Sequence, residues 1–329
     1  MANAVLTTPQ IPFESRGLDK KQTWWERLRK GDEVAHLITL AGGWSILIIT
    51  ALLVQHLWVF SRLSRHAFGW HFLVDSTWDP VNGHFGAWPF VYGTVVTSLL
   101  ALAISIPIGI GSAIFLAELA PRKLSNGLTF LIELLAAVPS VIYGLIGIFL
   151  LIPFLFNVVP YFQKYFGWIP IFNGTFYGVS YFSASIVLSI MVVPFIISIS
   201  REVLIAVPVS QREAMMALGA TKWDVTWRAV VPYARQGIMG SIFLSLARAL
   251  GETMAVTMVI GNVAQVSTSL MAPGYTIAAV IANEFTEATG DLYLHALIEL
   301  GLVLFVVTMI FNALARLLML TMKGHEVVG

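Results

Sequence analysis

The stretch SQREAMMALGATKWDVTWRAVVP, residues Ser210 to Pro232, is a polar interruption in an otherwise apolar chain. Ser210 precedes Glu213 by three residues, which is the spacing of a capping box, so we expect a short helix to begin here. The apolar residues on one side of that helix are Ala214, Met215, Ala217 and Leu218. Gly219 then stands where the helix would end through a left-handed residue. This half of the stretch predicts an amphipathic helix that touches another protein.

The second half of the stretch repeats the signal for a helix start. Thr221 precedes Asp224 by three residues and predicts a second capping box. We expect the helix that begins there to run through Trp227 until Pro232 disturbs it, because proline has no N–H to donate. The whole stretch is therefore predicted to form a helix, a glycine elbow and a second helix.

The composition places most of the chain in a lipid bilayer. Hydrophobic residues make up 57% of the sequence and charged residues 11%, and the mean hydropathy is +0.82, unlike a soluble domain. Cysteine is absent, which excludes disulfides, thiolate metal sites and cysteine nucleophiles. His66, His71 and His84 lack the spacing of a helical metal pair, so we expect no metal site.

Six apolar runs are each long enough to cross a hydrocarbon core of about 30 Å with roughly twenty residues. They predict an all-α integral membrane protein with spans at approximately 37–60, 89–118, 128–156, 181–200, 237–261 and 296–318. The second and third runs exceed the minimum length, so they must tilt or kink. The prolines at the expected kinks are Pro107, Pro139 and Pro194. The second run also carries a small-residue face that allows close helix contact, made of Gly109, Ala113 and Ala117.

The distribution of lysine and arginine predicts the orientation in the membrane. Six of these cations precede the first span, two lie at 120–126, five at 201–236 and two near the C-terminus, whereas the opposite loops hold three. Both termini and the Ser210–Pro232 stretch are therefore expected in the cytoplasm. The chain is predicted to consist of an N-terminal tail, a six-helix membrane domain and a C-terminal tail, at 1–36, 37–318 (with the loop 201–236) and 319–329.

Ionisable side chains inside spans indicate function, because a charge at the bilayer centre costs about 2.5–3.5 kcal/mol on insertion scales. The candidates are Glu133, Arg248, Glu252 and Glu299, whereas Glu118 lies near a span end and is expected at the interface. Arg248 and Glu252 are four residues apart, so on one helix they share a face and can pair. Arg248 would offer forked donors to an oxyanion, and Glu252 would hold the arginine when the path is empty. The alternative is a structural ion pair that joins two helices.

Three residues in the third run bring polar groups next to a proline. Pro139 frees a backbone carbonyl one turn earlier, and Ser140 and Tyr143 add hydroxyls on a nearby helical face. They form either a gate in the path or a kink that packs against a partner.

The Ser210–Pro232 stretch resembles the cytoplasmic loop of ABC-importer permeases. The residues at the places of the family's pattern are Glu213, Ala214, Gly219, Ala229, Val231 and Pro232. Met215 replaces the family's second alanine, and Ala229 is smaller than the usual isoleucine. The resemblance implies a type I ABC-importer permease fold with a coupling helix, and it implies that the residues docking the ATPase are Ser210, Glu213, Ala214, Met215, Leu218 and Gly219. An amphipathic helix at the membrane surface, with ordinary caps, is the alternative.

Longer runs resemble the PstC family of phosphate-importer permeases, namely 93–119, 136–144, 248–262 and 275–288. The resemblance implies that Arg248 and Glu252 belong to a phosphate path in the plasma (inner) membrane. It also implies a heterodimer with a PstA-like permease, two PstB-like ATPase subunits and a PstS-like phosphate-binding protein. The sequence contains no G-x-x-x-x-G-K-[ST] loop, so we expect ATP and Mg on the separate ATPase subunits and no cofactor on this chain.

Other functions fit the same residues. A forked arginine accepts any tetrahedral oxyanion, so a permease for sulfate, molybdate or phosphonate is the nearest alternative. A proton-coupled secondary transporter would move protons through Glu133, Glu252 and Glu299 and would need no coupling loop. A short helix is also expected to begin at Thr276, where it either meets an external partner or packs on this subunit alone.

Overall fold

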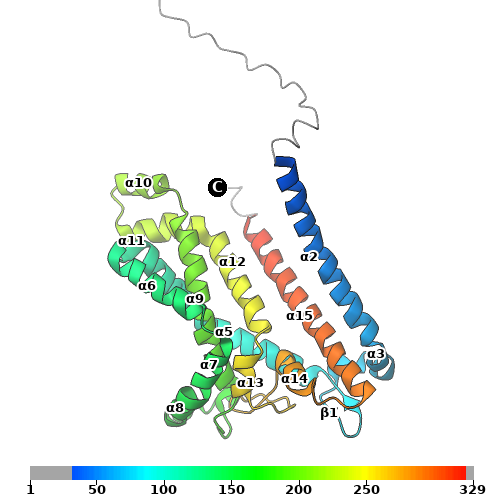
Figure 1. Cartoon of the computed structure of the whole chain (residues 1–329). Helices are drawn as coiled ribbons and strands as arrows, with labels where there is room; N and C mark the ends of the chain where they lie inside the picture. Colours follow the sequence, from blue (N-terminus) through cyan, green and yellow to red (C-terminus); the bar gives the residue numbers. More distant parts are fainter. Residues whose placement is uncertain (1–31, 324–329) are drawn as a thin grey trace, which may run out of the picture. The chain divides into compact units, whose positions relative to one another are not determined.

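The computed structural model describes residues 32–323, with the helices and strands labelled in Figure 1. The chain divides into two compact units, Met1–His56 and Leu57–Gly329. Helix α2 (Asp32–Phe60) makes up the described part of the first unit and ends in the second. It begins five residues before the predicted first span. The rest of the predicted N-terminal tail, and residues 324–329 of the predicted C-terminal tail, lie outside the described residues.

Five helices are long and apolar enough to cross a membrane, and counting one bent pair as a span gives six. The first four spans consist of α2, of α5 (Trp88–Ile114) with η1 (Phe115–Leu119), of α7 (Ser140–Ile146) with η2 (Gly147–Leu151) and α8 (Ile152–Phe166), and of α9 (Tyr181–Ile205). The bent pair consists of the continuous helical stretch Lys222–Leu250, which ends with α12 (Val231–Leu250), and of α13 (Met254–Ile260). The last span lies in α15 (Asp291–Lys323). Both η1 and η2 are π-helical turns. The prediction of an all-α membrane protein with six spans is confirmed, with the fifth span broken.

The third span differs from its predicted range, 128–156. Helix α6 (Arg122–Ala136) ends before Pro139, and α7 begins after it, because this proline lacks an N–H and disfavours helical geometry in the residue before it. The span therefore runs over 140–166, and α6 is a separate helix that packs against α9. Glu133, which was predicted inside a span, is exposed on α6.

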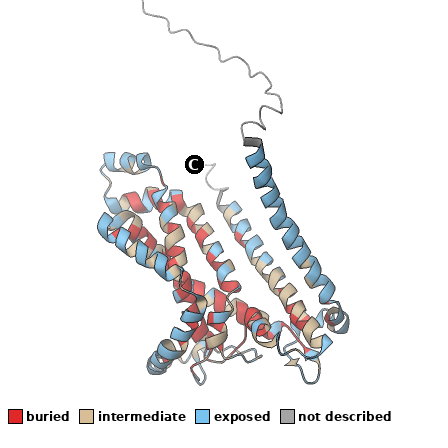
Figure 2. Cartoon of the chain, in the orientation of Figure 1, coloured by how far each residue is buried: buried red, intermediate tan, exposed pale blue. Residues whose placement is uncertain are grey.

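Helix α9 is central to the packing of the second unit. Its residues Leu188 and Ile196 are fully buried, and Figure 2 shows buried residues along α9 and α13. A Cβ on Gly109 of α5 would lie 2.6 Å from Cγ2 of Ile196, and Ala113 is fully buried, so the predicted small-residue face is confirmed. Pro107 and Pro194 lie inside α5 and α9, and both helices continue past them.

Short elements form a second core at the end of this unit where α15 begins (Figure 1). They are α3 (Arg62–Phe68), α4 (His71–Val74), the antiparallel strands β1 (Trp78–Asp79) and β2 (His84–Phe85), and α14 (Ile277–Glu284). The short helix η3 (Pro170–Phe172), which follows α8, is not part of this core. As expected, α14 begins at a cap in which Thr276 accepts the N–H of Ala279. Ile277 and Val280 are fully buried. This helix packs on its own subunit, and its contact with an external partner stays a prediction.

The elements of the Ser210–Pro232 stretch lie at the other end of the unit, where α15 ends (Figure 1). They are α10 (Val209–Ala217), α11 (Lys222–Val225) and the π-helical turn η4 (Thr226–Val230). The lysine and arginine distribution predicts this loop and the C-terminus on one side of the membrane. In agreement with this prediction, the loop and the end of α15 lie at the same end of the second unit.

Candidate functional site

Arg248 lies in the last turn of α12 and is exposed. Its guanidinium carbon is 5.4 Å from the centroid of the Phe195 ring on α9, which is the geometry of a cation–π contact. Within residues 32–323 the arginine makes no ion pair with any carboxylate. An aromatic ring steadies the cation without occupying its N–H donors, which leaves them available to an oxyanion.

Glu252 lies outside the helix that carries Arg248, which corrects the predicted arrangement. Helix α12 ends at Leu250, and α13 follows at an angle of 61°. The break begins at Gly251, a weak helix former, and Oε1 of Glu252 accepts the N–H of Ala255 at 3.2 Å. A side chain makes this kind of bond at the start of a new helix. Glu252 therefore caps α13, and the predicted pairing with Arg248 on one helical face is not formed.

Pro139, Ser140 and Tyr143 lie at a second break, between α6 and α7. Pro139 directly precedes α7, and Ser140 is its first residue. The Tyr143 hydroxyl donates a 2.7 Å hydrogen bond to the carbonyl oxygen of Leu135, four residues before the proline. This carbonyl lacks its usual helical donor because Pro139 has no N–H, and it accepts bonds from the Tyr143 hydroxyl and from the N–H of Val138 instead. Tyr143 is 6% exposed, so its ring fills the break instead of lining an open surface.

The two breaks are neighbours in space. A Cβ on Gly144 of α7 would lie 2.5 Å from Sδ of Met258 and 3.3 Å from Cα of Ala255, so α7 and α13 are in direct contact. Packing therefore joins two groups of residues that are about a hundred positions apart in the sequence.

Helix α10 begins at Val209 and not at a cap formed by Ser210. Pro208 precedes it with φ −56° and ψ 137°, and no side chain caps the helix. Ser210 lies within the first turn, so the predicted capping box with Glu213 is wrong. The reason is that the fixed φ of proline allows the helix to start directly after Pro208.

The glycine elbow and the second cap are confirmed. Gly219 has φ +84°, in the left-handed region. Oγ1 of Thr221 accepts the N–H of Asp224 at 3.2 Å, and Oδ2 of Asp224 accepts the N–H of Thr221 at 3.4 Å. The disturbance predicted near Pro232 is present as the π-helical turn η4, but it does not end the helix, because α11, η4 and α12 follow one another without a gap. The π-helical turn, with its i→i+5 hydrogen bonds, lies directly before Pro232. Because proline has no N–H, one of the regular i→i+4 hydrogen bonds is missing there.

The loop presents apolar side chains at its surface. Val209 is 62% exposed, Met216 48% and Leu218 85%. Of the six predicted docking residues, the exposed ones are Ser210, Glu213, Ala214, Leu218 and Gly219. Met215 differs, since it packs against the buried cluster formed by α5, α9 and α12. Exposed apolar side chains gathered in this way are typical of a surface that another protein covers.

Sequence reasoning missed Arg212, which ties α10 to the rest of the unit. Its Nη2 lies 2.8 Å from Oε1 of Glu118 at the end of η1, and their side chains are 16% and 10% exposed. Glu118 was predicted to be interfacial and not a partner of the loop. The available signal was a cation directly before Glu213, but its partner lies 94 positions away in the sequence.

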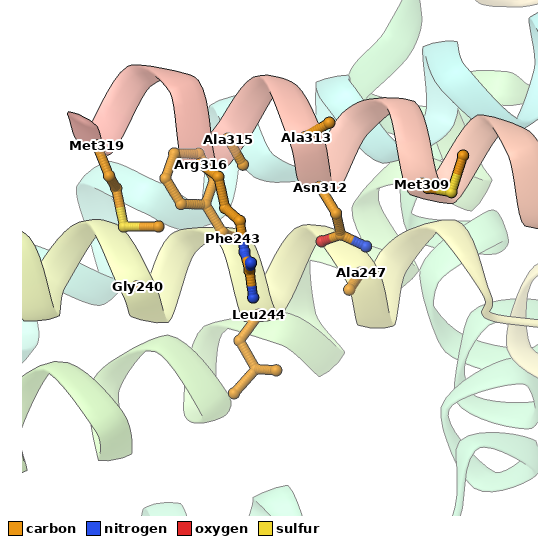
Figure 3. A pocket seen from close by; sticks show the side chains of 10 residues that line it. All are labelled: Gly240, Phe243, Leu244, Ala247, Met309, Asn312, Ala313, Ala315, Arg316 and Met319. Carbon is orange, nitrogen blue, oxygen red and sulfur yellow. The ribbon is translucent and has the colours of Figure 1, made fainter. Parts of the chain in front are cut away.

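A cavity of about 640 Å³ lies between α12 and α15 (Figure 3). Asn312 and Arg316 extend from α15 toward α12, where Leu244 and Ala247 form part of the opposite wall. Arg248 does not line this cavity, so it is separate from the predicted path.

Glu299, the remaining ionisable candidate, is 6% exposed on α15. It lines a second cavity, of about 680 Å³, together with Trp58, Arg65 and Trp88. Glu133 is on the surface of α6 and Glu252 caps α13, so the three glutamates proposed for a proton route belong to three different environments.

Comparison with known proteins gives a family and close relatives. The family model of binding-protein-dependent transport system inner membrane components matches residues 105–323. The phosphate transport system permease protein PstC of Mesorhizobium japonicum is 47% identical over 299 residues, covering 89% of this chain and 91% of that protein. PstC of Haemophilus influenzae is 43% identical over 307 residues, covering 92% and 95%. A probable PstC of Methanocaldococcus jannaschii is 34% identical over 87% of this chain and 92% of its own length.

A solved structure shares the fold. It is a bacterial ABC transporter involved in the import of the acidic polysaccharide alginate, and one of its chains matches with a TM-score of 0.53 and 14% sequence identity. The match covers 90% of this chain and 99% of that chain. At this identity the likeness concerns the arrangement of the helices alone.

Proposed function

The chain belongs to the family of binding-protein-dependent transport system inner membrane components, and we propose that it is the permease subunit of an ATP-driven ABC importer that moves inorganic phosphate into the cytoplasm. The observation that carries this function is the 47% identity to a phosphate transport system permease over 89% of the chain. The fold agrees, since the chain has six spans when the bent pair is counted as one.

Phosphate passes the helix break between α12 and α13 in this proposal. Arg248 provides the cation there, and the support is its exposure together with its free donors beside the Phe195 ring. Phosphate carries one to two negative charges at neutral pH and loses hydration in a narrow path, so a forked cation lowers the barrier to its passage. Glu252 holds the start of α13, and its charge near the break balances the arginine between turnovers. Tyr143 and Pro139 shape the adjoining break in α7.

The complex around this subunit contains separate proteins for energy and for capture. We place a PstA-like permease beside the chain as a heterodimer, two PstB-like ATPases with ATP and Mg on the cytoplasmic side, and a PstS-like phosphate-binding protein on the outer side. The support for the ATPase position is the exposed loop with Val209, Met216 and Leu218. Both termini face the cytoplasm of a plasma (inner) membrane protein, on the basis of the lysine and arginine distribution.

Uptake by the reconstituted complex tests the proposal. Proteoliposomes that hold the purified complex, with ATP inside and the binding protein outside, are expected to accumulate labelled phosphate only when ATP is present. An excess of unlabelled phosphate should compete, whereas equal amounts of sulfate, molybdate or a phosphonate should not. Equal competition by one of these oxyanions would assign the permease to that anion. Uptake that survives without ATP and collapses with an uncoupler would contradict the ABC mechanism.

A further inference from the structure

Helix α10 is held to the membrane helices by one charged side chain, by the apolar side chain of Met215 and by its contact with η4. None of its residues is buried. It carries two charged residues, of which Glu213 is exposed and Arg212 turns back toward the unit. Apolar packing adds the partly buried Met215. A movement of α10 therefore reaches the spans through Arg212, through Met215, through the contact with η4 and along the backbone.

Arg212 binds two different membrane helices at once. Nη2 and Nε donate to the two carboxylate oxygens of Glu118 at 2.8 and 3.4 Å. Nη2 also donates to the carbonyl oxygen of Leu204 at 2.8 Å, and Nη1 donates to that of Val207. Leu204 is in the last turn of α9, where carbonyls lack helical partners and a cation is favoured. One guanidinium thus joins α10 to the end of the second span and to the end of the fourth.

The two helices that Arg212 joins lead to the candidate path. Helices α5 and α9 pack on each other closely, as Gly109 and Ile196 show. Helix α9 in turn packs against α12 and α13, the two helices on either side of the break. Its Phe195 ring lies against Arg248. A pull on the ends of α5 and α9 therefore acts on elements in direct contact with the break.

We propose that the Arg212–Glu118 ion pair is the link through which α10 moves α5 and α9, so that it positions the membrane helices during transport. This role rests on the proposed function, since it requires an ATPase that moves α10. The forked guanidinium of Arg212 suits this role, because its two hydrogen bonds to the Glu118 carboxylate resist rotation of α10 relative to η1 as well as their separation. A lysine keeps the charge of Arg212 but not the fork.

The deciding measurement is the amount of phosphate taken up per ATP hydrolysed by intact complexes in proteoliposomes. We expect Glu118→Gln to lower this ratio about tenfold while ATP hydrolysis continues, because α10 still docks but no longer pulls on η1. Arg212→Lys should lower the ratio of phosphate to ATP by a smaller factor, and Glu118→Asp should retain part of the wild-type ratio. The matched control is Glu202→Gln, which removes the exposed carboxylate of the Arg201–Glu202 pair at the same end of α9. This control should keep the wild-type ratio.

A purely structural pair predicts a different result. Loss of stability reduces the number of complexes but leaves the ratio of the surviving complexes unchanged. A wild-type ratio in Glu118→Gln complexes that elute intact would overturn the inference. If that variant fails to assemble, Arg212→Lys decides, and an unchanged ratio in it has the same consequence. Failure of the proposed function is distinguishable, because the wild-type complex itself would then take up no phosphate.

Discussion

The hydroxyl of Tyr143 donates a 2.7 Å hydrogen bond to the carbonyl oxygen of Leu135, across the break that Pro139 makes between α6 and α7. The bond ties the first turn of α7 to the end of α6. The Tyr143 side chain that donates it is 6% exposed. The orientation of the third span near the candidate path therefore depends on a side chain and not on continuous helix.

Tyr143→Phe is expected to lower the free energy of unfolding of the complex by about 1 kcal/mol and to reduce phosphate uptake. The substitution removes one hydrogen bond from a buried site, while the Leu135 carbonyl keeps its bond from the N–H of Val138. The control is Tyr161→Phe on α8, where the side chain is 71% exposed. Thermal unfolding of the purified complexes measures the difference. Equal unfolding temperatures for the two variants would contradict the role of the bond.

Gly219→Val is expected to impair uptake although the subunit still inserts. The backbone at Gly219 has φ +84°, and no atom lies within 4 Å of an added Cβ, so the cost comes from the backbone alone. A β-branched residue in the left-handed region costs roughly 1–3 kcal/mol, whereas asparagine tolerates it. Gly219→Asn should therefore retain more uptake than Gly219→Val. The control Gly127→Ala, on α6 with open space around it, should behave as wild type. Full uptake by Gly219→Val would show that the elbow has no part in coupling.

Arg248→Ala is expected to abolish phosphate uptake, and Arg248→Lys to leave partial activity at best. The point charge survives in lysine but the forked donors do not. Arg316→Ala is the matched control, since Arg316 lines the separate cavity between α12 and α15. All three are compared in proteoliposomes with complexes that remain intact on gel filtration. The double variant Arg248→Ala with Glu252→Ala should stay inactive, because the two residues make no ion pair. Restored uptake in it would refute the anion path.

Glu252→Gln distinguishes the two roles given to Glu252, which are the cap on α13 and the negative charge near Arg248. Glutamine keeps an oxygen that accepts the N–H of Ala255, so the start of α13 should remain folded, whereas Glu252→Ala removes the cap at a cost of about 1 kcal/mol. If the carboxylate also balances Arg248, Glu252→Gln should lower uptake with unchanged thermal stability. Uptake equal to wild type in Glu252→Gln would leave the residue with a capping role alone.

The orientation can be tested with single thiols, because the chain has no cysteine of its own. Asn82→Cys and Thr268→Cys are expected to react with an impermeant reagent in intact cells, and both positions are exposed. Lys222→Cys, in the loop after Gly219, should react only after permeabilisation. Labelling of Lys222→Cys in intact cells would reverse the predicted orientation and separate the loop from the side where ATP is.

The sequence by itself determined the features that depend on neighbours along the chain. Apolar runs of sufficient length identified the spans, because a bilayer requires every backbone group to be bonded within the segment. Gly219 and the pair Thr221 and Asp224 were predicted correctly, since an elbow and a cap involve residues no more than a few positions apart. The same local reasoning failed at Ser210, where the preceding proline started the helix earlier.

Only the tertiary structure decided which distant residues meet. Glu252 caps α13 and makes no ion pair with Arg248, because the helix is broken at Gly251. A single glycine weakens a helix but does not by itself decide that the helix breaks there. The partner of Arg212 lies 94 positions away, on a different span. Such contacts depend on how whole helices pack. That packing is set by the fit of many buried side chains together, which the spacing of residues along one helix does not contain.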